Sequence, residues 1–123
     1  MKILNFQKLI NSFKFAFQGL KFAFSEQTFR IICFFAIFAI ILMIVFGVSL
    51  QEKIIVILLI ALVLSLELIN SQIEKILNIL QPNQDQKIKI IKDMSAAAVL
   101  LACLSALIIG ILIFLSYLLK LIC

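Results

Sequence analysis

The sequence ELINSQIEKILN, residues 67–78, lies at the end of a long apolar run and interrupts it with polar side chains. A helix has 3.6 residues per turn, so positions i, i+3, i+4, i+7 and i+11 lie on one face. The residues at these positions are Glu67, Asn70, Ser71, Glu74 and Asn78. Two carboxylates and three uncharged polar groups therefore form one stripe along a predicted helix.

The composition indicates that this helix lies in a membrane. With 65% hydrophobic and 14% charged residues among 123, the chain is too apolar for an ordinary soluble domain. A carboxylate inside a spanning helix costs about 2.5 to 3.5 kcal/mol on insertion scales, and such groups usually face a bundle interior and have a function. We therefore expect an all-α integral membrane protein, with a metal and proton-transfer site at the membrane surface.

Three apolar segments have the length of membrane-spanning helices. Residues 31–48 are an unbroken apolar run, close to the roughly 20 residues that a hydrocarbon core of about 30 Å requires. The second span includes the polar stripe, and a third follows the only proline, Pro82. We predict transmembrane helices over 30–48, 54–78 and 94–119 within one domain of residues 1–123, and a water-exposed loop over 81–92.

The first 25 residues predict an amphipathic helix. Apolar residues recur at three- and four-residue steps from Phe6 to Phe24, while Lys14 and Lys21 lie on the other side. A basic helix with a phenylalanine-rich face typically lies in the headgroup layer. We therefore predict an interfacial helix over 5–25. A secretory signal is the competing interpretation, but no small-residue cleavage site follows the segment.

The basic residues predict the orientation of the chain. Of the eleven lysines and arginines, five precede the first span and four lie between the second and the third, leaving Lys53 and Lys120 on the other side. The positive-inside rule therefore places the N-terminal helix and the loop 79–93 in the cytoplasm. The net charge of +5 does not indicate nucleic-acid binding, because the basic residues are spread out and form no base-reading motif.

Several familiar kinds of site are excluded by composition. Three cysteines lie in or at the end of apolar runs without pairing or metal-ligand spacing, and histidine is absent. The three glycines, Gly19, Gly47 and Gly110, are too far apart for a Walker A loop or a dinucleotide fingerprint. A nucleotide site in this chain must use another design.

The third span carries a ridge of small residues at every fourth position, namely Ala98, Ala102, Ala106 and Gly110. Such a ridge lets another helix approach closely. Three spans enclose little space, and a polar face would be partly exposed to lipid in a monomer. A homo-oligomer is expected, although the spacing alone does not separate packing within one chain from packing between chains.

The predicted topology gathers the unusual polar groups near the cytoplasmic interface, namely Glu26, Arg30, Glu74, Lys92 and Asp93. Glu26 and Glu74 are candidate ligands of Mg²⁺, which prefers a few carboxylate oxygens together with phosphate and water. Lys92 and Arg30 are candidates for neutralising phosphate oxygens. Glu67 is expected roughly 10 Å inside the hydrocarbon, where its carboxylate is placed to accept a proton from a lipid hydroxyl.

Four of these residues also have a purely structural interpretation, as helix caps or as side chains that reach back to the headgroups: Glu26, Arg30, Lys92 and Asp93. Glu67 and Glu74 favour function more strongly, because they share one face with Asn70. A non-enzymatic, ion-conducting oligomer whose buried acids bind cations is the competing function. It explains Glu67 well, but it explains less well why so many charges collect at one interface.

Three motifs lie at this interface: ELINSQIE from Glu67, KDMSAAAV from Lys92 and EQTFR from Glu26. In residue type, order and separation they resemble the prokaryotic diacylglycerol kinases, a family that includes undecaprenol kinases. The resemblance implies a homotrimer in the bacterial inner membrane, with three spans and an N-terminal surface helix in each chain. It implies that MgATP binds at the cytoplasmic surface and phosphorylates a lipid alcohol, in active sites that draw on neighbouring chains.

The matching positions imply Glu67 as general base and Glu26 and Glu74 as metal ligands. Further active-site groups implied are Asn70, Lys92 and Asp93, with Arg30 also assigned to the nucleotide. The resemblance favours diacylglycerol as the acceptor, with undecaprenol as the alternative. The chain departs from the usual family pattern at Phe15, Ile32, Asn78 and Asp85, and by a link from Gly19 to Glu26 that is one residue shorter.

Overall fold

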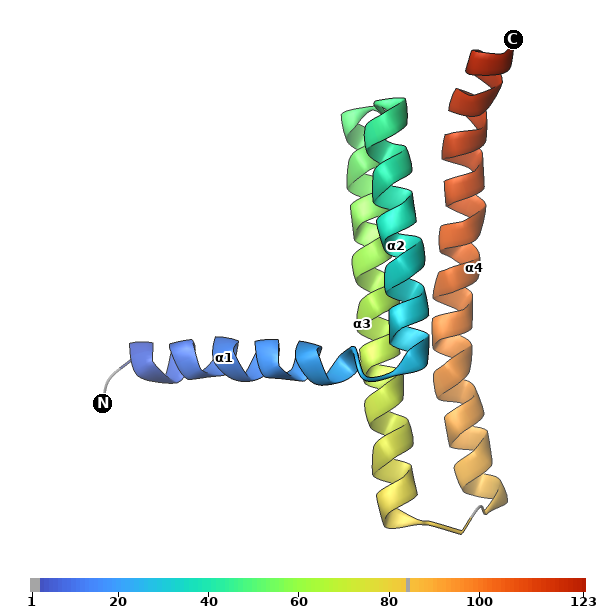
Figure 1. Cartoon of the computed structure of the whole chain (residues 1–123). Helices are drawn as coiled ribbons and strands as arrows, with labels where there is room; N and C mark the ends of the chain where they lie inside the picture. The colour runs from blue at the N-terminus through green and yellow to red at the C-terminus, as the bar shows by residue number, and fades with distance from the viewer. Residues whose placement is uncertain (1–2, 84) are drawn as a thin grey trace.

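Four helices make up the part of the chain that the computed structural model describes, residues 3–83 and 85–123 (Figure 1). They are α1 (Phe6–Ala23), α2 (Gln27–Phe46), α3 (Leu50–Leu80) and α4 (Gln86–Ile122). Helices α2, α3 and α4 run alongside one another, whereas α1 projects sideways from the N-terminal end of α2. The predicted all-helical fold with three long apolar helices is confirmed.

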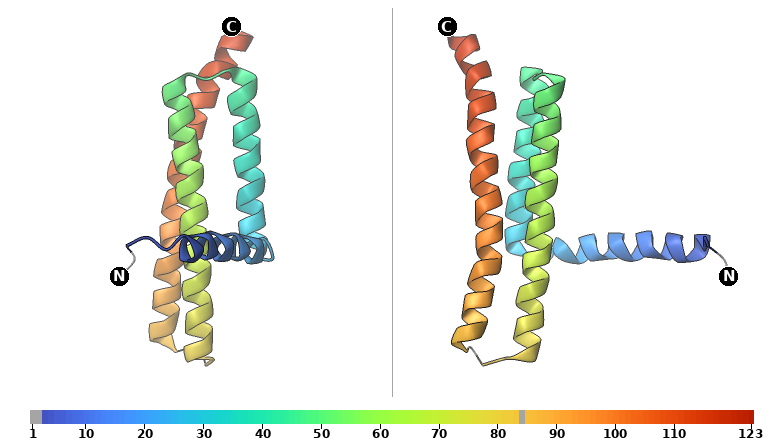
Figure 2. Two further views of the ribbon diagram at one scale, coloured as in Figure 1. Left: turned by 90° about the vertical axis from the view of Figure 1, so that its left-hand side faces the viewer. Right: turned by 180° about the vertical axis from the view of Figure 1, so that it is seen from behind.

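Each of the three bundled helices is long and apolar enough to cross a membrane. Helix α2 has 20 residues, α3 has 31 and α4 has 37. At 1.5 Å per residue, α2 is about 30 Å long, which matches a typical hydrocarbon core. The C-terminal end of α3 and the N-terminal end of α4 continue well past the level of α1 (Figure 2), so these two helices extend beyond the N-terminal end of α2.

The connection between α2 and α3 is tight because of two local features. Gly47 ends α2 in the left-handed region, with a φ of +58°, which favours glycine because it has no Cβ. Ser49 then caps α3 by accepting a hydrogen bond from the backbone N–H of Glu52 at 3.3 Å. The chain therefore reverses within a few residues and sets α2 and α3 side by side.

Helix α4 is fastened to this turn by Tyr117. Its hydroxyl donates to the Glu52 carboxylate at 3.0 Å and accepts from the backbone N–H of Ser49 at 3.3 Å. The Tyr117 ring also lies 6.3 Å from that of Phe46, beside a small buried cluster of Met43, Val48 and Val56. This end of the bundle is thus joined by both polar and apolar contacts.

The predicted loop over 81–92 is wrong in its second half. Asp85 accepts a hydrogen bond from the backbone N–H of Lys87 at 3.4 Å and starts α4 there, so the helix begins eight residues before the predicted span at 94. The connection is therefore only 81–85, of which Gln84 lies outside the described residues. The interpretation of Asp93 as a helix N-cap is also wrong, because Asp93 lies inside α4.

The other predicted boundaries differ by a few residues. Helix α2 begins at Gln27 and ends at Phe46, and α3 begins at Leu50, because the caps at Gly47 and Ser49 rather than the apolar runs define these ends. Helix α1 forms where the periodicity predicts it, starting after Asn5. Nearly all its side chains are exposed, and Ala23 is its one buried residue. Its position in the headgroup layer stays a prediction.

Candidate active site

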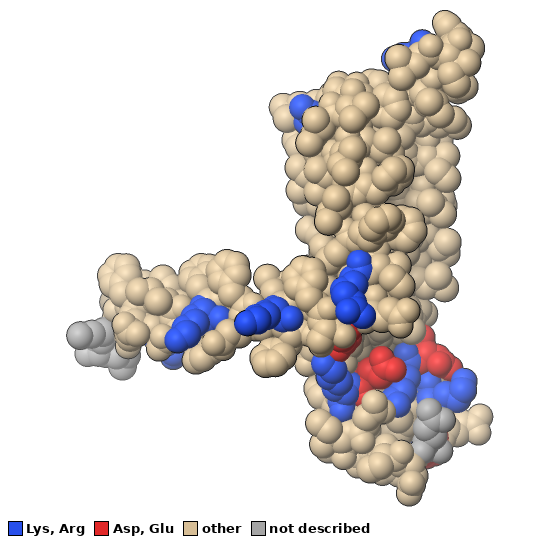
Figure 3. All heavy atoms as spheres, in the orientation of Figure 1, with Lys and Arg blue, Asp and Glu red and all other residues tan. Residues whose placement is uncertain are grey.

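Charged side chains are concentrated at one end of the bundle. On the face drawn in Figure 3, acidic and basic groups gather where α1 meets the bundle and on the parts of α3 and α4 beyond it. Between this zone and the far end of the bundle, the same face is almost entirely uncharged. The charged zone coincides with the cytoplasmic interface that the sequence predicts.

Glu67 is buried within this zone. It is 4% exposed, and Ser71, one turn further along α3, is 7% exposed. Together with Val63 they form a column of buried residues at four-residue intervals, so this face of α3 is turned towards its neighbours. Glu67 and Ser71 are the buried polar residues of the described chain, which sets Glu67 apart from the other acids.

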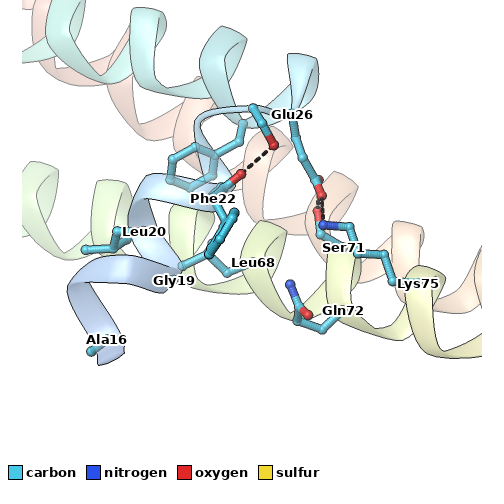
Figure 4. Close-up of a pocket in the computed structure, with 12 residues that line it drawn as sticks. Ala16, Gly19, Leu20, Phe22, Glu26, Leu68, Ser71, Gln72 and Lys75 are labelled. Carbon is cyan, nitrogen blue, oxygen red and sulfur yellow. Dashed lines mark hydrogen bonds and ion pairs between the residues drawn. The ribbon is translucent and has the colours of Figure 1, made fainter. Parts of the chain in front are cut away.

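Glu26 lies in the link between α1 and α2 and bonds to α3. One carboxylate oxygen accepts a hydrogen bond from the Ser71 hydroxyl, and the other lies 2.6 Å from Nζ of Lys75 (Figure 4). Glu26 occupies the N-cap position of α2 but its side chain makes no capping bond. The hydrogen bonds from Lys75 and then Ser71 lower the pKa of the Glu26 carboxyl below its ordinary value of 4.5, so it is ionised at neutral pH.

A pocket of about 510 Å³ opens beside this link, and we call it the α1 pocket. Its apolar wall comes from the end of α1 and from Leu68 of α3, and its polar wall includes Glu26 and Lys75. Figure 4 shows these side chains around the junction of the two helices. The pocket therefore presents an ion pair next to an apolar surface.

A second pocket, of about 240 Å³, lies between α3 and α4, and we call it the α3–α4 pocket. Its lining residues are Asn70, Glu74, Lys89, Lys92, Asp93 and Ala96. Nζ of Lys92 donates to the side-chain oxygen of Asn78, and Nζ of Lys89 lies 2.9 Å from Oδ2 of Asp93. Two ammonium groups and two carboxylates thus meet in one open, hydrophilic hollow.

The structure brings together four of the seven site residues that the sequence predicts. Asn70, Glu74, Lys92 and Asp93 line the α3–α4 pocket, whereas Glu26 lines the α1 pocket. Glu67 is buried and lines neither of these two pockets, and Arg30 is exposed and lines neither. Within one chain, the two carboxylates predicted to share Mg²⁺ therefore open into different pockets.

The two candidate carboxylate ligands, Glu26 and Glu74, suit a metal ion that keeps most of its water or phosphate ligands. Among residues 3–83 and 85–123, no three acidic, cysteine or histidine side chains converge to hold a metal. Mg²⁺ is commonly bound by one or two carboxylates plus substrate phosphates and water. Glu26 and Glu74 fit that mode of binding, and they do not fit a closed cage built from protein ligands alone.

Two lysines of this region were not predicted as site residues, because the sequence indicated only their effect on orientation. Lys75 follows Ser71 by four residues on the same face of α3, and both contact Glu26. Lys89 precedes Asp93 by four residues in α4, a spacing that was hidden because residues 81–92 were predicted to be a loop. Helical i, i+4 spacing was the signal available for Lys89 and Asp93, whereas no local pattern linked Lys75 to Glu26.

Comparison with known proteins identifies the family. The family model for prokaryotic diacylglycerol kinase matches residues 14–114, a range that holds all three motifs and both pockets. The chain is also 38% identical, over 95 residues, to the diacylglycerol kinase of Haemophilus influenzae, in a match that covers 76% of this chain and 80% of that protein. The chain therefore belongs to the prokaryotic diacylglycerol kinase family of membrane-bound lipid kinases.

Proposed function

We propose that this chain transfers the γ-phosphate of MgATP to the hydroxyl of diacylglycerol, giving phosphatidic acid, at the cytoplasmic face of the bacterial inner membrane. The observation that carries this proposal is the burial of Glu67 one turn away from Asn70, which lines an open pocket that also contains Lys89 and Lys92. A proton acceptor shielded from water thus lies beside a place where phosphates can be neutralised. Family membership favours this function over an ion-conducting oligomer.

The α3–α4 pocket is the proposed site for the nucleotide phosphates. Phosphoryl transfer depends mainly on positioning and charge neutralisation, so a site without a Walker A loop is sufficient. Lys92 is held by the neutral side chain of Asn78, at the position where the family usually has an aspartate. Because an amide does not cancel the charge of an ammonium group, Lys92 keeps its full positive charge for a phosphate.

Glu26 and Glu74 are the proposed ligands of Mg²⁺. When bound, Mg²⁺ supplies charge neutralisation at the phosphate oxygens. Because the two carboxylates open into different pockets, they act on one ion only if Glu26 leaves its present partners or if a neighbouring chain supplies one of them. The second arrangement agrees with the proposed homotrimer, whose active sites draw on more than one chain.

Glu67 is the proposed general base. A carboxylate below the headgroups is at the depth of the hydroxyl of a lipid alcohol, and a positioned base typically contributes a factor of about 10² to 10⁴ in rate. The exposed, basic, phenylalanine-rich surface of α1 is proposed to rest in the headgroup layer. Asn70 and Asp93 complete the proposed site, and Arg30 is assigned to the nucleotide from outside the pocket.

Purified protein supplied with Mg²⁺, radiolabelled ATP and one lipid at a time tests this function. We expect label in phosphatidic acid when diacylglycerol is supplied, and less or none in undecaprenyl phosphate. Both alcohols present a single hydroxyl at the same depth. Because each lipid is supplied alone, the labelled product shows directly which alcohol is the acceptor. Labelling of undecaprenol alone would overturn the proposed acceptor, and labelling of neither lipid would overturn the proposed reaction.

A further inference from the structure

Both oxygens of the Glu26 carboxylate are already occupied by groups from α3. Oε1 lies 2.6 Å from Nζ of Lys75, and Oε2 accepts the hydroxyl hydrogen of Ser71. Ser71 and Lys75 are one helical turn apart, so both reach the α1–α2 link from the same face of α3 (Figure 4). Each oxygen of this carboxylate therefore already has one partner, and a metal ion that binds Glu26 meets the ammonium group of Lys75.

An ammonium group and a divalent cation compete for the same carboxylate oxygen. Each is attracted by the same negative charge, and two cations on one oxygen repel each other strongly. The side chain of Lys75 is 54% exposed, whereas that of Glu26 is 24% exposed. Lys75 is therefore already largely hydrated and can swing away into water, while Glu26 stays in the wall of the α1 pocket.

We propose that Lys75 is a built-in competitor of the divalent cation, and that it holds the Glu26 carboxylate until a metal ion displaces it. This inference rests on the proposed function only in taking Glu26 as a metal ligand. Its consequence is that Lys75 raises the concentration of divalent cation needed to occupy Glu26. Ser71, which is neutral, orients the carboxylate in both states and does not compete for its charge.

Equilibrium binding of Mn²⁺ tests the competition without any phosphate transfer. The probe is Mn²⁺ alone, titrated into the full chain in detergent micelles and followed by electron paramagnetic resonance of free Mn²⁺. Exposed ion pairs are worth little, so in Lys75→Met we expect a Kd for Mn²⁺ about two- to five-fold lower than in the unchanged chain. Lys75→Arg, which keeps the charge, is expected to restore the weaker binding.

Two controls separate competition from general effects. Lys87→Met removes one positive charge from the same end of the bundle, and Lys87 has no ion pair among the described residues, so it measures the long-range electrostatic contribution. Glu26→Gln removes the proposed ligand, and the double variant with Lys75→Met is expected to bind Mn²⁺ as Glu26→Gln does. Thermal melting in the same detergent confirms that each variant is folded.

The proposal is overturned if Lys75→Met binds Mn²⁺ no more tightly than the unchanged chain, or no more tightly than Lys87→Met. It is also overturned if Lys75→Met shows no detectable Mn²⁺ binding. In activity assays, the half-saturating concentration of Mg²⁺ is expected to fall while kcat stays within about a factor of two, a split that loss of structure would not produce. Lipid phosphorylation by the unchanged chain is scored separately, so failure of the competition and failure of the proposed function give different results.

Discussion

At the scale of single residues, Glu67 and Glu26 are both carboxylates of the same interface, and their surroundings give them different properties. Glu67 is enclosed by helices and lies away from water, whereas Glu26 lies at a pocket wall with a lysine and a serine on its oxygens. The first environment suits a group that takes up a proton. The second suits a group that stays ionised and binds a cation.

Replacing Glu67 by Gln removes the proposed base at nearly constant shape. We expect kcat for lipid phosphorylation to fall by about 10² to 10⁴, with the melting temperature and nucleotide binding largely unchanged. The assay is turnover with labelled ATP, with Glu52→Gln as the matched variant at the opposite end of the bundle. Retention of normal turnover in Glu67→Gln would show that another group takes the proton.

Glu26 makes stability depend on pH. Its pKa in the folded chain is below the ordinary 4.5, so the ionised form stabilises the fold above about pH 4.5, and this contribution is lost as the pH falls through the folded pKa. In the presence of a chelator, we therefore expect the unchanged chain to melt a few degrees above Glu26→Gln near pH 7. The two curves should converge at acidic pH, and a difference that grows on acidification would contradict the assignment.

The polar stripe was predictable residue by residue, because helical periodicity alone places Glu67, Asn70 and Glu74 on one face. The ion pair between Glu26 and Lys75 was not predictable in the same way. It joins residues 49 positions apart, and no local pattern indicates which of several lysines meets which acid. The structure supplies that pairing by setting the N-terminal end of α2 beside Ser71.

At the scale of elements, the turn between α2 and α3 fixes how these two helices lie. Gly47→Ala places a Cβ in the left-handed region, and we expect a loss of stability of about 1 to 2 kcal/mol, measured as a lower melting temperature. Gly47→Asn is the matched variant, because Asn tolerates this conformation better. Equal melting temperatures for Gly47→Ala and the unchanged chain would show that the turn relaxes.

The contact of Tyr117 with the α2–α3 turn is a second interaction that stabilises this end of the bundle. Tyr117→Phe removes a hydroxyl that both donates to Glu52 and accepts from the Ser49 N–H, while it keeps the ring beside Phe46. We expect the free energy of unfolding to fall by about 1 kcal/mol. Because this end lies far from the charged zone, KM for ATP should not change, and a changed KM would indicate coupling along α4.

Helix identity was predicted from the apolar runs, but several ends were not. The predicted loop 81–92 was judged by its proline and its many polar residues, and those same lysines and glutamines are good helix formers. Asp85 is an N-cap that the composition concealed. Gly47 and Ser49 are typical residues of helix ends, but the predicted spans followed the apolar runs and placed these ends at 48 and 54.

At the scale of the whole molecule, the distribution of charge predicts which way the chain faces. With Cys33, Cys103 and Cys123 replaced by Ser, a single cysteine at Gln51 or at Asn83 marks the two ends of the bundle. In spheroplasts, we expect an impermeant maleimide to label Gln51→Cys but not Asn83→Cys until the membrane is opened. The reverse pattern would place the charged zone outside the cell, away from ATP, and would defeat the proposed function.

The membrane character and the charged end followed from the sequence, because they depend on composition and on sums over many residues. The sideways course of α1 agrees with the interfacial helix predicted over 5–25, but the bonds from Glu26 to α3 that hold the link 24–26 were not predictable. The homotrimer stays a prediction. It is supported by the separation of Glu26 and Glu74 into two pockets, whereas the small-residue ridge of α4 packs within one chain at Ala102.

The difference in length between the three bundled helices has a consequence for the lipid around them. Helix α2 has 20 residues, so it just spans a typical hydrocarbon core when it stands upright. Helices α3 and α4 are long enough to span a thicker bilayer. Longer acyl chains would therefore draw Glu26 into hydrocarbon, or the annulus of lipid would have to thin around the protein. Helix α2, the shortest of the three bundled helices, would then make the kinase sensitive to membrane thickness, with its optimum where the thickness of the hydrocarbon core equals the length of α2.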